Sequence, residues 1–274
     1  MFDTVIEMLS YPFMTRAFLV GSLVALCSAL LGVSLVLKRY SMIGDGLSHV
    51  GFGAMAIAAA MNAAPLTVAI PVVIVAAILL LRISGNAKIK GDAAIALIST
   101  TSLAVGVMVI SLTTGMNTDV YNYMFGSILA MSAEDVKLSL VLSVCVLILF
   151  IVFYHKIFAI TFDETFARAT GVKAGVYNTL IALLTAVTIV LGMRMMGALL
   201  ISSLIIFPAL TSMRVCRTFK SVIINAAIVS VVCLIAGVTL SYVAATPAGA
   251  SVVLANLVMM VLYTVVGAVK NHIR

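Results

Sequence analysis

Nine long apolar segments make up most of this 274-residue chain. A helix that crosses the hydrocarbon core of a bilayer needs about 20 predominantly apolar residues. The segments cover residues 17–37, 44–61, 64–82, 92–113, 136–154, 176–193, 197–213, 220–242 and 250–269. They leave room for short loops and for no soluble domain. The sequence therefore predicts an all-α, polytopic membrane helix bundle that forms a single domain over residues 1–274.

Composition excludes the main soluble classes. Hydrophobic residues make up 64% of the chain and charged residues 9%, against about 45–50% and about 25% in soluble domains. A soluble fold of this length has no means of covering so much apolar surface. An intrinsically disordered chain, a secreted disulfide scaffold and a nucleic-acid-binding module are excluded on the same ground.

Two of the nine segments are interrupted. The seventh is short and carries Pro208, whose missing N–H is expected to kink it, as a hinge or only as a bend. The second carries Asp45 and His49. Because either segment can be a broken or re-entrant helix, eight complete spans are the alternative to nine.

The positions of the basic residues predict the orientation of the chain. If the segments alternate across the membrane, three of the 16 lysines and arginines, Arg16, Lys137 and Arg194, face one side. All the others face the opposite side, and positive charge of this kind marks cytoplasmic loops. They are Lys38, Arg39, Arg82, Lys88, Lys90, Lys156, Arg168, Lys173, Arg214, Arg217, Lys220, Lys270 and Arg274. Nine spans then place the N-terminus outside and the C-terminus in the cytoplasm.

Common catalytic motifs are absent. The chain has no GxxxxGK[ST] sequence, so it is not expected to hold a nucleotide phosphate by itself. It has no HExxH or GxSxG sequence, which the usual membrane hydrolases require. The four cysteines form no CxxC pair and are interpreted as small hydrophobic residues. The sequence therefore favours a transport protein over an enzyme, with no permanently bound cofactor.

Asp45 and His49 are the most informative pair of polar residues. They are four residues apart at the start of the second segment, so a helix places them on one face with Cβ atoms about 5–6 Å apart. Ionisable groups inside a span are costly and usually line a protein-enclosed path. Imidazole suits zinc and carboxylate suits harder ions such as manganese. The pair is therefore predicted to be half of a divalent-metal site, with Ser48 as a possible further oxygen.

An alternative interpretation of the same pair is structural. Asp is a good N-cap, so Asp45 can simply cap the second helix with His49 hydrogen-bonded to it. One Asp and one His are also too few ligands for a tight site. A symmetric dimer doubles the ligands, and a site that passes an ion onward should not hold it too well. Gly46 leaves space for local unwinding, which makes it a hinge or gate candidate.

Two long loops contain aromatic and charged residues. Residues 155–175 form a helix-length stretch that Gly171 is expected to end. This loop is either an interfacial amphipathic turn or a docking helix for a cytoplasmic partner. Residues 114–135 are expected outside, where Asp119 and Tyr121 are candidates for contact with an arriving protein, although exposed loop residues often have no such role.

Five motifs in order resemble the permease subunits of bacterial zinc and manganese ABC importers. The stretch 38–49 resembles a basic loop followed by G-D-[AG]-[LI]-[SA]-H. The others are similar to an outer-loop segment, a coupling-loop motif, a G-x-L-L…P-A span and an L-S-Y…P-[SA]-G element. They cover residues 123–129, 162–172, 197–209 and 240–250. Gly46 stands where alanine is common in the family, which affects local helix geometry.

The resemblance implies a fold, partners and site residues. The fold is that of a type II ABC importer permease, working as a homodimer with cytoplasmic ABC ATPase subunits and an extracytoplasmic metal-binding protein. Asp45 and His49 are implied to lie in the translocation path. The coupling residues implied to contact the ATPase are Phe162, Asp163, Glu164, Phe166, Ala167, Arg168 and Gly171. The location implied is the bacterial cytoplasmic membrane.

The predicted function is import of a divalent transition metal, driven by ATP hydrolysis on a separate subunit. Zinc is the first expectation for the transported ion, because His49 is present and the outer-loop motif is closer to zinc-type members. Manganese is the second and ferrous iron the third. Two other classes stay open, an ATP-independent secondary transporter or channel and an intramembrane metalloenzyme. The metalloenzyme needs a third ligand at membrane depth and an activating carboxylate, for which the sequence offers no convincing pair.

Overall fold

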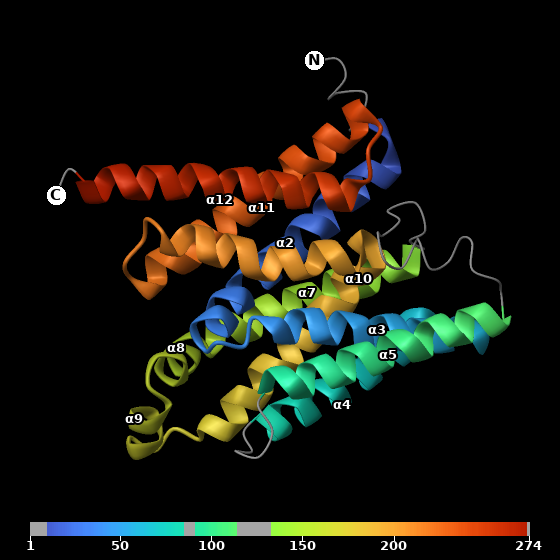
Figure 1. Cartoon of the computed structure of the whole chain (residues 1–274), viewed down its shortest axis with the longest axis horizontal. Coiled ribbons are helices and arrows are strands. Elements are labelled where there is room, and N and C mark those ends of the chain that lie inside the picture. Colours follow the sequence, from blue (N-terminus) through green and yellow to red (C-terminus); the bar gives the residue numbers. More distant parts are fainter. Residues whose placement is uncertain (1–9, 85–90, 114–132, 273–274) are drawn as a thin grey trace.

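The computed structural model describes residues 10–84, 91–113 and 133–272, and these residues fold into helices connected by short turns (Figure 1). The described helices are α2 (Pro12–Leu37), α3 (Met42–Ala60), α4 (Pro65–Ser84), α5 (Gly91–Thr113), α7 (Ala133–Val152), α8 (Tyr154–Phe162), α9 (Glu164–Ala169), α10 (Ala174–Met213), α11 (Phe219–Ala244) and α12 (Ala248–His272). The all-α prediction is confirmed for this part of the chain.

Eight of the described helices are long and apolar enough to cross a membrane. Seven of these candidate spans have 19 to 26 residues, whereas α10 has 40. A straight helix of that length is about 60 Å long, twice the thickness of a hydrocarbon core of about 30 Å. The predicted sixth and seventh segments are thus the two parts of α10, which accounts for the difference between nine segments and eight helices.

The two parts of α10 fold back on each other at Gly197. Its backbone is non-helical, with φ 82° and ψ 163°, a conformation that only glycine adopts readily. A Cβ placed on Gly192 would lie 2.3 Å from the side chain of Ile201, although nine residues of straight helix span about 13 Å. The chain therefore reverses direction here, and its described residues pass along the bundle nine times. Pro208 lies in α10 with helical backbone, so the break in this helix is at Gly197, and the kink expected at Pro208 stays a prediction.

The connections alternate between the two ends of the bundle. Figure 1 shows the α2–α3 turn, α8, α9, the α10–α11 turn and the C-terminus at one end. The reversal at Gly197 lies at the other end, where Arg194 Nη2 is 3.9 Å from Asp135 Oδ2 near the start of α7. The elements that carry the predicted cytoplasmic cations therefore gather at one end, and the N-terminal end of α2 lies at the opposite end.

Small residues bring the central helices together. A Cβ on Gly32 of α2 would lie 2.0 Å from the Ile205 carbonyl oxygen of α10. A Cβ on Gly53 of α3 would lie 2.7 Å from the Ser102 carbonyl oxygen of α5. In a membrane, close backbone approach of this kind provides the van der Waals contact that drives helix association. Helices α2, α3 and α10 accordingly form the buried centre, and α12 lies at the edge.

Candidate functional site

Helix α3 carries the predicted metal pair. It begins at Met42 after the N-cap residue Ser41, whose side chain makes no capping hydrogen bond. Asp45 is therefore the fourth residue of the helix, and the interpretation of Asp45 as the N-cap is wrong. The helix runs without a break to Ala60, so Gly46 lies in regular helix; its part as a hinge stays a prediction.

Asp45 and His49 lie side by side on one face of α3, as their spacing predicts. Asp45 Oδ2 is 3.6 Å from His49 Nε2. Ser202 of α10 donates a hydrogen bond from its hydroxyl to Asp45 Oδ1, at 3.4 Å. A carboxylate, an imidazole and a hydroxyl from two helices thus converge, and these are oxygen and nitrogen donors that a divalent transition metal accepts.

Ser48 does not join this group. Its side chain is fully buried and its hydroxyl donates to the Asp45 backbone carbonyl oxygen at 2.7 Å. The hydroxyl that supplements Asp45 therefore comes from Ser202, which the sequence interpretation missed. The only sequence signal for Ser202 is its place inside the predicted 197–209 span, because the pairing joins residues 157 positions apart.

The pair lies in the first two turns of α3, close to the turn that precedes the helix. Ile205 of α10 contacts the positions of both Gly32 on α2 and Gly44 on α3. Gly32 is five residues from the end of α2, more than one helical turn. Gly44, next to Asp45, therefore packs level with helical residues of α2. An ionisable side chain within a spanning helix is costly unless it meets polar partners.

The face that carries the pair is open in the single chain. The side chain of Asp45 is 45% exposed and that of His49 is 24% exposed. Gly44 packs against Ile205 of α10 and Gly46 against Ile95 of α5, so these two helices flank the open face. Figure 1 shows the same order, with α3 between α5 and the second part of α10.

The two helices that carry Asp45, His49 and Ser202 also expose large apolar side chains. They include Met42 and Ile57 of α3 and Leu199 and Leu210 of α10. Over the described ranges, no three His, Cys, Asp or Glu side chains form a group that could hold a metal ion. The assignment of Asp45 and His49 as metal ligands therefore stays a prediction.

The predicted coupling loop forms two short helices. Asp163 separates α8 from α9 and caps α9, because its Oδ1 accepts a hydrogen bond from the Phe166 N–H at 2.9 Å. Gly171 ends this segment as predicted, with φ 86° and with Val172 N–H donating to the Ala167 carbonyl oxygen at 2.9 Å. This is the Schellman arrangement, in which glycine tolerates the left-handed conformation.

Exposed aromatic side chains lie at this end of the bundle. Phe162 is 61% exposed and Phe166 is 66% exposed. The Phe162 ring also packs against Phe158, at 4.9 Å between centroids, and both rings contact Phe219 at the start of α11. The aromatic contacts hold α8 on the bundle and leave one face of α8 and α9 uncovered.

Glu164 connects α9 to the end of α2 and to the first part of α10. It contacts Lys38 Nζ at 3.1 Å, Arg168 Nη2 at 2.6 Å and Asn178 Nδ2 at 3.1 Å. Burial disfavours the charged carboxylate, but the hydrogen bonds from Asn178, Arg168 and Lys38 and the charge of Lys38 lower its pKa to about 2. In the sequence, Lys38 marks the orientation and begins the basic loop at residues 38–49, and no pattern singles out Asn178.

The remaining predicted residues divide into two groups. Ala167 is the buried residue of α9, and Pro208 is buried within α10. Asp119 and Tyr121, the candidates for contact with an outer protein, lie outside the described residues. Their predicted role therefore stays a prediction.

Comparison with known proteins places this geometry in a family. A family model described as the ABC 3 transport family matches residues 10–267. The chain is 31% identical to the high-affinity zinc uptake system membrane protein ZnuB of Haemophilus influenzae, over 90% of this chain and 94% of that protein. It is 33% identical to a probable iron transport system membrane protein of the same organism, over 88% and 86%.

Two further proteins are similar over nearly their whole length. The manganese transport system membrane protein MntC of Halalkalibacterium halodurans is 28% identical, over 90% of this chain and 85% of that protein. The solved structure of PsaBC from Streptococcus pneumoniae in complex with Fab contains a chain with a TM-score of 0.85 and 26% identity, over 95% and 94%. These relatives are membrane proteins of metal transport systems, with zinc, manganese and iron all named among them. The chain therefore belongs to the ABC 3 transport family, and it is a membrane protein of the metal ABC transporter permease type.

Proposed function

We propose that this chain is the membrane subunit of an ATP-driven importer for a divalent transition metal. The observation that carries the proposal is the meeting of Asp45, His49 and Ser202 on an open face between α3 and α10. A carboxylate so placed is expensive unless it faces protein or water. A transport function explains why the chain carries this carboxylate. The oxygen and nitrogen donors of the site replace part of the water shell that the ion loses.

The open face is completed by a second copy of the chain. A twofold arrangement doubles the donors from one Asp and one His to two of each, which is a sufficient set for zinc or manganese. It also covers the exposed Met42, Leu199 and Leu210 of the same two helices. A homodimer therefore removes the carboxylate from contact with lipid and creates a path between two identical chains.

ATP hydrolysis takes place on separate cytoplasmic subunits that bind α8 and α9. The exposed rings of Phe162 and Phe166 are apolar anchors of the kind that dominates protein interfaces. Charged Glu164 and Arg168 beside them provide a polar rim. ATP-driven closure of the two ATPases then moves α8 and α9, and the dimer opens first to one side and then to the other.

The orientation follows from the basic residues. The end that carries α8, α9 and the C-terminus is cytoplasmic, because most lysines and arginines belong to it. The N-terminus is then outside the bacterial cytoplasmic membrane. An extracytoplasmic metal-binding protein delivers the ion to the outer end, and Asp119 and Tyr121 are the candidates for that contact.

Zinc is the proposed ion among the three that the relatives' names mention. Histidine is a preferred zinc ligand, and a tetrahedral set of two carboxylates and two imidazoles suits zinc. Manganese accepts the same donors and is the second candidate, and ferrous iron is the third.

The test is metal uptake into proteoliposomes that contain the chain with its ATPase. We expect ATP-dependent uptake of zinc that stops when the catalytic glutamate of the ATPase is replaced by glutamine. Uptake of manganese or iron in place of zinc would change only the assigned ion. Uptake that continues without ATP and follows the proton gradient would instead establish the secondary-transporter alternative and contradict the proposal.

A further inference from the structure

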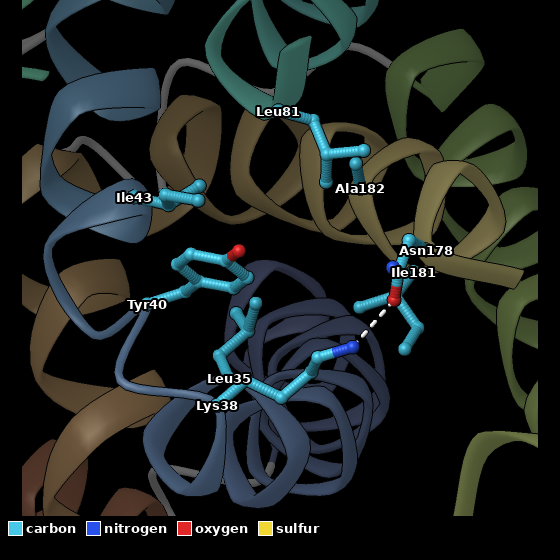
Figure 2. A pocket seen from close by; sticks show the side chains of 8 residues that line it. All are labelled: Leu35, Lys38, Tyr40, Ile43, Leu81, Asn178, Ile181 and Ala182. Atoms are coloured by element: carbon cyan, nitrogen blue, oxygen red, sulfur yellow. Dashed lines mark hydrogen bonds between the residues drawn. The ribbon is translucent and has the colours of Figure 1, made fainter. Parts of the chain in front are cut away.

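Lys38 connects the predicted coupling helix to the turn that precedes the metal-site helix. Its side chain is 9% exposed, and its amine is 3.1 Å from Glu164 Oε2 of α9. The same amine donates a hydrogen bond to Asn178 Oδ1 of α10 at 2.5 Å, which Figure 2 shows as a dashed line. Since Asn178 also donates to Glu164 Oε2, the three side chains form a closed network.

The turn between α2 and α3 is short and hydrogen-bonded, and it connects Lys38 directly to the helix that carries Asp45 and His49. Lys38 is the C-cap of α2, and Arg39 adopts the left-handed conformation with φ 62°. Tyr40 N–H donates to the Leu35 carbonyl oxygen at 2.8 Å, and Ile43 N–H donates to the Tyr40 carbonyl oxygen at 3.0 Å. This hydrogen-bonded turn passes directly into α3, so a displacement of Lys38 is transmitted to Asp45 seven residues later.

The side chains around the turn form a small cavity. Leu35 of α2, Tyr40 of the turn and Ile43 of α3 line one side of it (Figure 2). Leu81 of α4 and Ile181 and Ala182 of α10 line the other side. The Lys38 stem lies along the same wall, and its amine reaches past the apolar groups to Asn178. The position of the amine is therefore determined by packing as well as by charge.

Helix α9 has few other attachments of its own. Among its six residues Ala167 is the buried one, while Phe166 and Arg168 are largely exposed. Arg168 pairs with Glu164 within the same helix, so that pair does not anchor α9 to the bundle. Glu164, through Lys38 and Asn178, is the side chain that makes charged contact with α2 and α10.

We infer that Lys38 is a positioning residue for transport: its contacts with Glu164 and Asn178 couple movement of α9 to movement of α3 and its Asp45–His49 pair. The inference rests on the proposed function and adds the route by which the ATPase reaches the metal site. When Lys38 is replaced, Glu164 keeps its contacts with Arg168 and Asn178, and its side chain is 32% exposed, so it is not left as an unpaired buried charge. Loss of Lys38 is therefore expected to affect coupling more than folding.

The experiment measures metal ions transported per ATP hydrolysed, in proteoliposomes that contain the full complex with its binding protein. The probe is the metal that the wild-type complex transports. For Lys38→Gln we expect ATP hydrolysis to continue while the ratio falls at least about fivefold, the lower range of coupling between distant sites. Lys38→Arg keeps the charge and the donors and is expected to restore about half of the ratio or more.

Arg39→Gln is the matched control, because it removes the neighbouring positive charge from the same turn and keeps a non-glycine residue at the left-handed position. Arg39 is exposed, and its variant is expected to keep the wild-type ratio. If Lys38→Gln does not assemble with the ATPase, Asn178→Ser is measured instead, since it removes the acceptor for Lys38 and the donor to Glu164.

Three results would overturn the inference. The first is an unchanged ratio of metal transported to ATP hydrolysed in Lys38→Gln or in Asn178→Ser, and the second is an equal fall of this ratio in Arg39→Gln. The third is a parallel loss of uptake and ATP hydrolysis with the ratio preserved. Failure of the proposed function has a different result. In that case the wild-type complex itself hydrolyses ATP without moving zinc, manganese or iron.

Discussion

Helices α3 and α12 show how differently two helices of the same bundle relate to their surroundings. The most apolar 18-residue stretch of α12 has a mean hydropathy of 2.3 and only 17% of it is buried. In α3 the corresponding hydropathy is 1.2, while 72% is buried. The less apolar helix is therefore the more buried one, the reverse of the usual relation in soluble proteins.

The difference follows from the solvent. Lipid tails are as apolar as leucine, so burial of leucine against protein gains little, and small residues that allow close packing determine which helices lie inside. Helix α3 has Gly44, Gly46, Gly51 and Gly53 within ten residues, whereas α12 exposes residues such as Leu254 and Val261. The same packing provides a protein surrounding for Asp45 and His49, which α12 could not provide.

The largest expected effect is on transport. Replacing both polar residues of α3, Asp45→Ala with His49→Ala, should lower metal uptake more than about tenfold, since loss of metal-site groups commonly costs this much. The matched control is Thr264→Ala on α12, where the hydroxyl is exposed and bonds only to the Met260 carbonyl oxygen. Uptake is measured at equal protein levels. Normal metal uptake by the double variant would show that α3 does not carry the metal site.

The next effect is on stability and compares the same substitution in the two helices. Leu47 of α3 is fully buried and Leu254 of α12 is 58% exposed. Leu47→Ala leaves a cavity and should lower the free energy of unfolding by about 2 kcal/mol or more. Leu254→Ala shortens an exposed side chain and should change it by less than about 0.5 kcal/mol. Thermal unfolding in detergent measures both, and equal losses would contradict the assignment of an inner and an outer helix.

A smaller loss is expected where α3 meets α5. The methyl group of Gly53→Ala would lie 2.7 Å from the Ser102 carbonyl oxygen, and backbone cannot move aside as a flexible side chain can. We expect a loss of about 1–3 kcal/mol in the free energy of unfolding, as for other overpacked sites. Gly175→Ala is the control, because no atom lies within 4 Å of its added Cβ. A stabilising Gly53→Ala would show that α3 and α5 are farther apart.

The smallest effect is a pH dependence of the α9 attachment. In the folded state the pKa of Glu164 is about 2, below the ordinary value of 4.5. The charged Glu164 side chain therefore stabilises the folded state fully above about pH 4.5. The contribution is lost as the pH falls from 4.5 toward 2. Amide hydrogen exchange of residues 164–169, compared with Glu164→Gln at each pH, should therefore converge on the variant in acid. A constant difference across this range would contradict the network.

Several features could be predicted from the sequence because they depend on local composition. Apolar runs of span length located the helices, and the cations predicted which connections share an end of the bundle. The spacing of Asp45 and His49 predicted that they share a helix face. The two-helix form of α10 was also visible as two apolar runs, because the polar residue between them, Arg194, marks the reversal.

Other features depend on contacts that local patterns do not contain. The spanning helices are apolar all round, so the sequence did not indicate which face of α3 meets α10, and Ser202 was missed. Pro208 was expected to bend the chain, yet the break lies at Gly197, where φ 82° requires glycine. Lys38 and Glu164 are separated by 126 residues, and no periodicity predicts their contact.

The most direct test of the account is a cryo-electron microscopy map of the complete transporter in a lipid bilayer, examined for what contacts Asp45 and His49. We predict that the second copy of the chain covers them, with its own Asp45–His49 pair across a twofold axis and with water or a metal ion between. Acyl chains in contact with both side chains, at a distance from that axis, would contradict the account.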